Sequence, residues 1–169
     1  MEKRLSEEAG GRFLEVLGRH EHIITKVIRI YGVDSQDRRD LFQEIVYQLW
    51  RSFGSFKGES RISTWLYRVA INTAITSFRK TKRVPEHTEL DDRSVHVLPQ
   101  FDRPDRSEQV QQLYSAIRNL GEVDRALVML YLEELSYKEI AEVLGLTEDN
   151  VGVKLNRIKT KLRVLMGAN

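Results

Sequence analysis

The alternation of apolar and polar positions predicts helices along most of the chain. Between Val151 and Leu165, apolar residues recur every three or four positions, which is the spacing of one buried helix face. Similar periodicity, with Ser35 and Ser63 as expected helix caps and with breaks at glycines, predicts helices over residues 7–31 (one or two), 35–51, 63–83, 107–120, 123–133, 137–144 and 148–166. No pair of strands is predicted, so the expected fold class is all-α.

A proline-containing segment separates the helical regions. All three prolines lie between Pro85 and Pro104, in a stretch that is rich in Asp, Glu and Arg and follows neither helical nor strand periodicity. We therefore predict two small helical domains, residues 1–84 and 107–169, joined by a flexible linker over residues 85–106. A long ordered loop inside one domain is the alternative.

Composition excludes several classes of protein. The chain has 169 residues and no cysteine, so disulfides and thiol catalysis are excluded. Its longest apolar run, Ala126 to Leu132, is far shorter than the ~20 residues that span a bilayer, and its first residues lack a signal peptide. No carboxylate–histidine set has metal-ligand spacing. We expect a cytoplasmic protein without membrane insertion, cofactor, metal or enzymatic activity.

Charge is distributed in blocks, although the net charge is only +2. Residues 57–83 carry seven basic groups and one acidic group, and residues 150–169 carry five basic groups and none acidic. The sequence between them is acidic. Localised positive charge is typical of surfaces that bind nucleic acid. Ordinary variation along solvated helices is the alternative.

The C-terminal segment has the spacing of a helix-turn-helix. Ser136 and Glu139 form a capping-box pattern, Ala141 is small where two helices approach, and Gly145 stands where the turn needs a positive φ. Opposite the apolar stripe of the second helix lie groups that can hydrogen-bond base edges, surrounded by cations: Val153, Asn156, Arg157 and Thr160, flanked by Lys154, Lys159 and Lys161. We predict that this face reads duplex DNA; an ordinary helical hairpin with a solvated basic face is the alternative.

A second polar and basic stripe follows the helix predicted over residues 63–83. It consists of Trp65, Arg68, Asn72, Thr76, Arg79 and Arg83, and the preceding turn-rich segment adds Lys57 and Arg61. An aromatic side chain among cations suits stacking on an unpaired base while the arginines follow the backbone. The alternative is that Trp65 folds into the core.

The helix predicted around residues 37–51 also has two faces. Phe42, Ile45, Val46 and Leu49 form its apolar side, and Asp40, Gln43, Glu44, Tyr47 and Arg51 project from the other. Such an acidic-polar patch with a central tyrosine suits docking to a basic protein partner. From the residues alone, a solvated surface is the default.

Taken together, these segments resemble a known family. The chain contains DLFQEIVYQLW, then FKGESRISTWLYRVAINTAI, then the linker, then LSYKEIAEVLGLTEDNVGVKLNRIKTKL. This order and spacing, from Phe13 to Leu165, is similar to that of extracytoplasmic-function sigma factors of bacterial RNA polymerase. The resemblance implies an alternative sigma factor that binds core polymerase and directs promoter-specific initiation. A stand-alone helix-turn-helix regulator is the competing function, and it leaves the Trp65 stripe unexplained.

The resemblance also implies roles for individual segments. The Asp40–Arg51 helix would bind the clamp helices of the largest polymerase subunit, and the 54–63 loop with the Trp65–Arg83 helix would melt and read the minus-ten element. The Asn150–Lys161 helix would read the minus-thirty-five element as duplex, and the acidic linker would follow the RNA exit path. Promoter DNA, as duplex and as melted strand, and an anti-sigma factor are further implied partners. The chain departs from the family pattern at Gly152, Val153 and Asn156, where a basic, a small hydroxyl and an apolar or aromatic residue are frequent.

Overall fold

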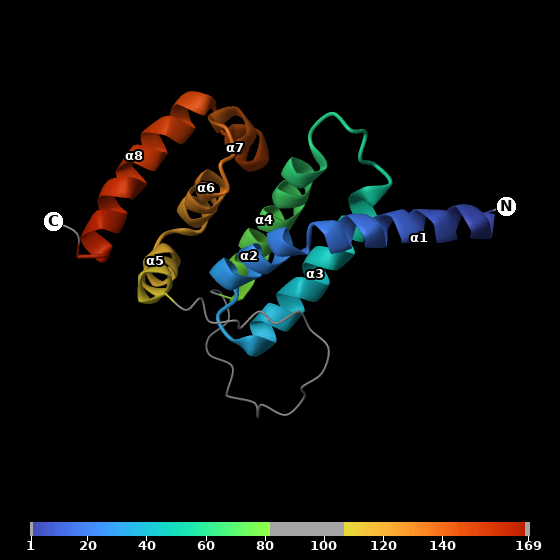
Figure 1. Cartoon of the computed structure of the whole chain (residues 1–169), viewed down its shortest axis with the longest axis horizontal. Coiled ribbons are helices and arrows are strands. Elements are labelled where there is room, and N and C mark those ends of the chain that lie inside the picture. The colour runs from blue at the N-terminus through green and yellow to red at the C-terminus, as the bar shows by residue number, and fades with distance from the viewer. Residues whose placement is uncertain (1, 82–106, 168–169) are drawn as a thin grey trace. The chain divides into compact units, whose positions relative to one another are not determined.

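The computed structural model describes residues 2–81 and 107–167, and these residues form helices and no strand (Figure 1). The helices are α1 Glu2–Arg19, α2 Glu21–Tyr31, α3 Ser35–Phe53, α4 Ile62–Thr81, α5 Glu108–Arg118, α6 Glu122–Leu132, α7 Tyr137–Leu144 and α8 Glu148–Leu165. The predicted all-α class is confirmed. No described helix is both long and apolar enough to cross a membrane.

The chain divides into two compact units, residues 1–74 and residues 75–169. The border falls inside α4, whereas the sequence predicts a first domain that ends at residue 84. The predicted linker, residues 85–106, lies outside the described residues. The domain boundaries therefore stay a prediction.

The core of the first unit consists of aliphatic side chains from α2, α3 and α4. Each of these helices contributes residues three or four positions apart, so that one face is buried. The buried set includes Ile23, Ile24, Val27, Ile28, Leu41, Ile45, Leu49, Leu66, Ala70, Ile71 and Ala74. This packing fixes the rotation of α3 and α4, and therefore fixes which side chains they present to solvent.

Two helix starts differ from the sequence prediction. Asp34, rather than Ser35, is the N-cap of α3: its backbone is extended (φ −126°, ψ −177°) and its side chain accepts a hydrogen bond of 2.8 Å from the Asp37 amide. Likewise α4 begins at Ile62, so Ser63 lies within its first turn rather than at its cap. At α3 the residue before the helix, Asp34, has the non-helical backbone that a cap requires.

The turn between α2 and α3 is unusually close. A Cβ atom on Gly32 would lie 2.5 Å from Cγ of Arg38 and 2.9 Å from the carbonyl oxygen of Ile28. No residue with a side chain fits there without movement of α3. Gly32 is therefore needed for the approach of the two helices, in addition to ending α2 as predicted.

In the second unit, α6, α7 and α8 pack on one another, and α5 packs on α6 and α8. The core is again aliphatic, and it includes Ile117, Leu120, Leu127, Leu130, Ile140, Val143, Val151, Leu155 and Ile158. One buried cation, Arg125, donates from Nε to the Leu120 carbonyl (2.9 Å) and from Nη2 to the Arg118 carbonyl. Its guanidinium thus satisfies carbonyl groups that the end of α5 leaves without helical partners.

Candidate nucleic-acid interface

The helix-turn-helix predicted from the sequence is formed by α7 and α8. Ser136 caps α7 and exchanges hydrogen bonds with Glu139 in a complete capping box. Gly145 adopts the left-handed conformation (φ 66°, ψ 35°), and the amide of Leu146 bonds the Ala141 carbonyl at 3.0 Å. Thr147 then caps α8 by accepting from the Asn150 amide at 3.3 Å. These local bonds fix the angle at which α8 leaves the turn.

The outer face of α8 carries the predicted duplex-reading residues. Val151, Leu155 and Ile158 are buried, as the periodicity predicts, and this turns the opposite face to solvent. Six of the predicted residues are exposed and Lys154 is half-buried; the exposed ones are Asn150, Val153, Asn156, Arg157, Thr160 and Lys161. We call these seven residues the α8 reading face. It combines amide, hydroxyl and guanidinium groups with two lysine ammonium groups, the chemistry that reads base edges and binds phosphates.

Two residues of α8 differ from the sequence prediction. Leu165, the last residue of the predicted apolar stripe, is 44% exposed. Lys159, predicted to flank the reading face, donates from Nζ to the hydroxyl of Tyr131 at 3.0 Å and lies 4.2 Å from the centre of its ring. The ammonium group of Lys159 therefore contacts Tyr131 of α6 and does not flank the reading face.

The predicted stripe along α4 is present, with Trp65 in an intermediate position. Its ring is half-buried, 5.2 Å from the ring of Phe56 and 6.3 Å from that of Phe53 between centroids. Trp65 is therefore neither buried in the core nor freely exposed, the two states considered from the sequence. One part of the ring packs on the loop that precedes α4 while the remainder is accessible to a base.

The other residues of the stripe divide by exposure. Asn72, Thr76 and Arg79 are exposed and Arg68 is half-buried. In the loop before α4, Lys57 and Arg61 are exposed. Arg83 lies outside the described residues. The opposite side of α4 is buried through Leu66, Tyr67, Ala70 and Ala74, as predicted, whereas Phe78 is half-buried. The structure thus presents a polar and cationic surface with an aromatic ring at its head; we call it the α4 stripe.

The predicted docking face of α3 is exposed at every position: Asp40, Gln43, Glu44, Tyr47 and Arg51. Gln36 donates to Asp40 at 2.9 Å, and Gln48 donates to Glu44 at 2.9 Å. Both carboxylates are thereby oriented along the helix. On the buried side, Ile45 and Leu49 are in the core, whereas Phe42 and Val46 are only half-buried.

The docking face extends further than the sequence indicates. Trp50 is 45% exposed and lies one turn from Tyr47, which is 56% exposed. The inner edge of Trp50 contacts Phe13 of α1, with ring centroids 5.1 Å apart. Exposed Tyr and Trp side chains are enriched at protein interfaces. We call this set, with Trp50 added, the α3 docking face.

Comparison with known proteins identifies the family. Residues 16–84 match the family model described as Sigma-70 region 2, and residues 110–162 match that of Sigma-70, region 4. The chain is 32% identical to the ECF RNA polymerase sigma-E factor of Haemophilus influenzae over 167 residues, covering 89% of this chain and 87% of that protein. This chain belongs to the extracytoplasmic-function (ECF) sigma factor family.

Further relatives agree. The ECF RNA polymerase sigma-E factor of Escherichia coli is 30% identical and covers 83% of this chain, which spans 79% of it. The RNA polymerase sigma-H factor of Pseudomonas aeruginosa is 31% identical and covers 75% of this chain, which spans 71% of it. The chain is therefore an alternative sigma factor in transcription initiation, and the stand-alone regulator is not favoured.

Two solved structures share the fold. The sigma factor RpoE from Bartonella quintana, determined with the anti-sigma factor NepR, matches with a TM-score of 0.69 at 18% identity, covering 96% of this chain and 99% of that one. CnrH, determined with the cytosolic domain of CnrY, matches with a TM-score of 0.66 at 20% identity, covering 97% and 95%. The helical architecture of this ECF sigma factor is therefore that of its structural neighbours.

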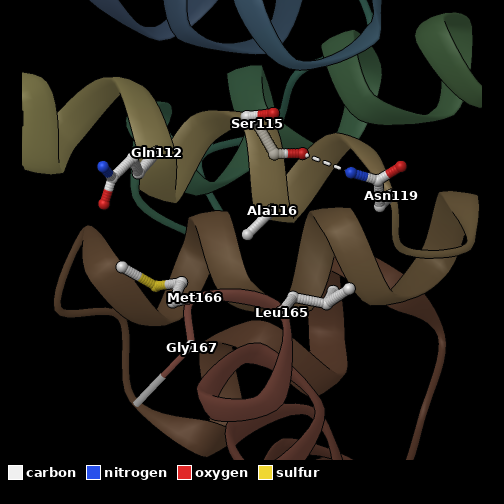
Figure 2. Close-up of a pocket in the computed structure, with 7 residues that line it drawn as sticks. All are labelled: Gln112, Ser115, Ala116, Asn119, Leu165, Met166 and Gly167. Atoms are coloured by element: carbon white, nitrogen blue, oxygen red, sulfur yellow. Dashed lines mark hydrogen bonds between the residues drawn. The ribbon is translucent and has the colours of Figure 1, made fainter.

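A separate cavity of about 390 Å³ lies between α5 and the end of α8 (Figure 2). Its lining is polar on α5 and largely apolar beyond it: Gln112, Ser115, Ala116 and Asn119, then Leu165, Met166 and Gly167. Within it, the Asn119 side-chain amide donates to the Ser115 carbonyl at 3.0 Å, which holds that side chain along α5. No charged side chain lines the cavity. It offers no cation to a phosphate and forms no part of the α8 reading face.

Proposed function

We propose that this ECF sigma factor acts in the cytoplasm by binding core RNA polymerase through the α3 docking face. The face is acidic at Asp40 and Glu44 and aromatic at Tyr47 and Trp50. Such a surface suits a partner that presents basic and apolar side chains, because charge complementarity guides encounter and buried aromatic rings supply much of the affinity.

The α8 reading face is proposed to bind the minus-thirty-five element as duplex. Asn156 and Arg157 supply amide and guanidinium groups for base edges, and Lys154 and Lys161 supply charge for phosphates. If the face made about four phosphate contacts, log K would fall with log salt at a slope of about −3.6. Such a small electrostatic contribution predicts weak promoter binding by the free chain.

The α4 stripe is proposed to read the minus-ten element after its bases leave the duplex. The half-exposed ring of Trp65 offers a stacking platform, and Arg68, Asn72 and Arg79 lie along the same helix face to follow the strand. Lys57 and Arg61, in the preceding loop, add positive charge beside the stacking platform. The chemistry of transcription stays with the polymerase, so no catalytic residue is assigned to this chain.

The remaining predicted partners follow from the same arrangement. We assign region-2 function to residues 1–84, region-4 function to residues 107–169, and the RNA exit path to the acidic linker at 85–106. An anti-sigma factor is the expected inhibitor, because a solved neighbour of this fold, RpoE from Bartonella quintana, has been determined in complex with one. The observation that carries the proposal is the presence, in one chain, of a helix-turn-helix with an exposed polar and basic face on α8 and of a separate cationic stripe headed by Trp65.

Run-off transcription tests the proposal. Core polymerase is incubated with promoter fragments, with and without the purified chain, and transcripts are mapped. Specific initiation only when the chain is present is the expected result. Initiation unchanged by the chain, or repression of a promoter without any need for core polymerase, would refute it.

A further inference from the structure

An interhelical contact brings a tyrosine of α7 against the backbone of α8. Gly152 lies inside α8, where glycine costs about 1 kcal/mol relative to alanine. A Cβ atom at this position would lie 3.4 Å from Cε2 and 3.9 Å from Cδ2 of Tyr137, the first residue of α7. The phenol ring therefore lies over the place where a side chain at position 152 would extend.

This contact is at the edge of the α8 reading face. At 100° per residue, Gly152 is one turn before Asn156 and borders the exposed face rather than the buried stripe. Tyr137 is 40% exposed, so one side of its ring covers the α8 backbone while the rest faces solvent. The Ser136 capping box fixes the start of α7 and therefore the position from which the ring projects.

The position of Tyr137 matches a phosphate contact. In a helix-turn-helix, the first helix crosses the DNA backbone while the N-terminal turns of the second approach the base edges. Tyrosine hydroxyls are among the groups that bind phosphate oxygens and set the register of the protein on the duplex. A ring supported by another helix loses little side-chain freedom on binding, which favours the contact.

We propose that Tyr137 is a DNA-binding residue of this sigma factor and that Gly152 is the position that admits it. The phenolic hydroxyl donates a hydrogen bond to a backbone phosphate beside the minus-thirty-five element. This phosphate lies at the edge of the α8 reading face that contains Asn156. This inference rests on the proposed function of the α8 reading face. In this arrangement the side chain beside the α8 backbone at position 152 comes from Tyr137 of α7, because Gly152 has none.

The geometry also predicts how position 152 responds to substitution. The 3.4 Å separation is an ordinary van der Waals contact, so an alanine is accepted with the ring in place. A leucine at the same position extends into the volume of the ring and displaces it. Gly152→Ala should therefore keep promoter affinity, whereas Gly152→Leu should lower it.

The test uses the complete holoenzyme and measures closed-complex affinity for promoter duplex at low temperature. Tyr137→Phe keeps the ring but removes the hydroxyl, and is expected to lower affinity about three- to tenfold, the effect of one hydrogen bond. The loss should be equal on the cognate promoter and on one with a substituted minus-thirty-five element, because a phosphate contact carries no sequence information. The slope of log K against log salt should not change, since an uncharged hydroxyl releases no counterion.

Tyr114→Phe, the same chemical change on α5, is the matched control and should bind as the wild type does.

A double variant with Gly152→Leu and Tyr137→Phe distinguishes two causes of a lower affinity. The leucine could act by displacing the Tyr137 ring, or by a clash of its own with the DNA. Once Gly152→Leu has displaced the phenol, adding Tyr137→Phe should cause no further loss, and additive losses would contradict the assignment. Wild-type affinity for Tyr137→Phe, or a loss confined to the cognate sequence, would overturn the phosphate contact while leaving the proposed function intact. A wild-type holoenzyme that prefers no promoter over random DNA would overturn the proposed function, and the role of Tyr137 with it.

Discussion

Replacing Trp65 with alanine removes the ring that we assign to stacking on a melted base, and it also removes part of the first unit's packing. The ring lies 5.2 Å from Phe56 and 6.3 Å from Phe53, within the range of favourable aromatic pairs. Any loss of promoter melting in Trp65→Ala must therefore be separated from a loss of folding.

The size of the folding effect follows from these contacts. Each aromatic pair contributes about 0.5–1.5 kcal/mol. A fully buried aromatic residue costs about 3–5 kcal/mol when it is truncated to alanine, and the half-buried Trp65 should cost less. We expect Trp65→Ala to lower the free energy of unfolding by about 2–3 kcal/mol. Phe53→Leu, which loses the pairs with Phe13 and Trp65 but leaves the indole in place, is the matched control for stability.

The assay follows unfolding of the free variants by circular dichroism and promoter melting in holoenzyme by permanganate footprinting. At a temperature where every variant is folded, Trp65→Ala should form closed complexes normally and fail to melt duplex promoter. Stacking is worth about 1–3 kcal/mol per base, so a template with a pre-formed bubble should partly rescue the variant. Arg157→Ala should instead lose closed-complex affinity on both templates, because its contact is with duplex.

Two results would refute this reasoning. If Phe53→Leu, with a similar loss of stability, failed at melting as severely as Trp65→Ala, then Trp65 would act through packing alone. If Trp65→Ala and Arg157→Ala failed equally on duplex and on bubble templates, the division into a strand reader and a duplex reader would be wrong.

Three further predictions concern other surfaces. Reversing the charges of Asp40 and Glu44 together should weaken competition for core polymerase without loss of helicity, and unchanged affinity would mean that this face is only solvated. Ser136→Ala should lower the stability of the second unit by about 1 kcal/mol through loss of the cap, measured by chemical unfolding, and an unchanged midpoint would contradict the role of the capping box. Burial, with the nearby charges of His22 and Arg19, lowers the pKa of His20, so the folded state binds its proton more weakly than the unfolded state. Stability from this group is therefore complete above the unfolded pKa of about 6.5 and is lost as pH falls below it; His20→Gln should flatten that dependence, and a variant that keeps it would assign the effect elsewhere.

Local interactions were the most predictable from the sequence. The capping box at Ser136, the positive φ at Gly145 and the buried stripe of α8 depend on residues within one or two turns of each other. Their spacing therefore carries the information needed. The exposed positions of the α8 reading face follow from the same periodicity, because burying one side of a helix determines the other.

Contacts between elements distant in sequence were not predictable in this way. Helical phase places Trp65 on the polar side of α4, opposite the buried residues, and its half-buried state depends on Phe53 and Phe56 from the preceding helix and loop. The exposure of Trp50 depends in the same way on where Phe13 of α1 packs. For the contact with Tyr137, a glycine in the middle of a helical pattern at Gly152 was the only signal, and it does not name the partner.

The choice between two adjacent capping residues was also beyond the sequence pattern. Asp34 and Ser35 both belong to the residue types that favour N-caps. In the structure Asp34 has the extended backbone and accepts the hydrogen bond from the Asp37 amide, so Ser35 is already helical. The residue types alone do not distinguish these two positions.

Promoter binding by the chain with and without core polymerase tests the central claim most directly. Fluorescence anisotropy would follow labelled promoter duplex with the free chain, with core polymerase and with both, at increasing salt. The account predicts weak binding by the free chain, and tight sequence-specific binding only when both components are present. Tight, sequence-specific binding of promoter duplex by the free chain would contradict it, because the α8 reading face would then suffice without polymerase.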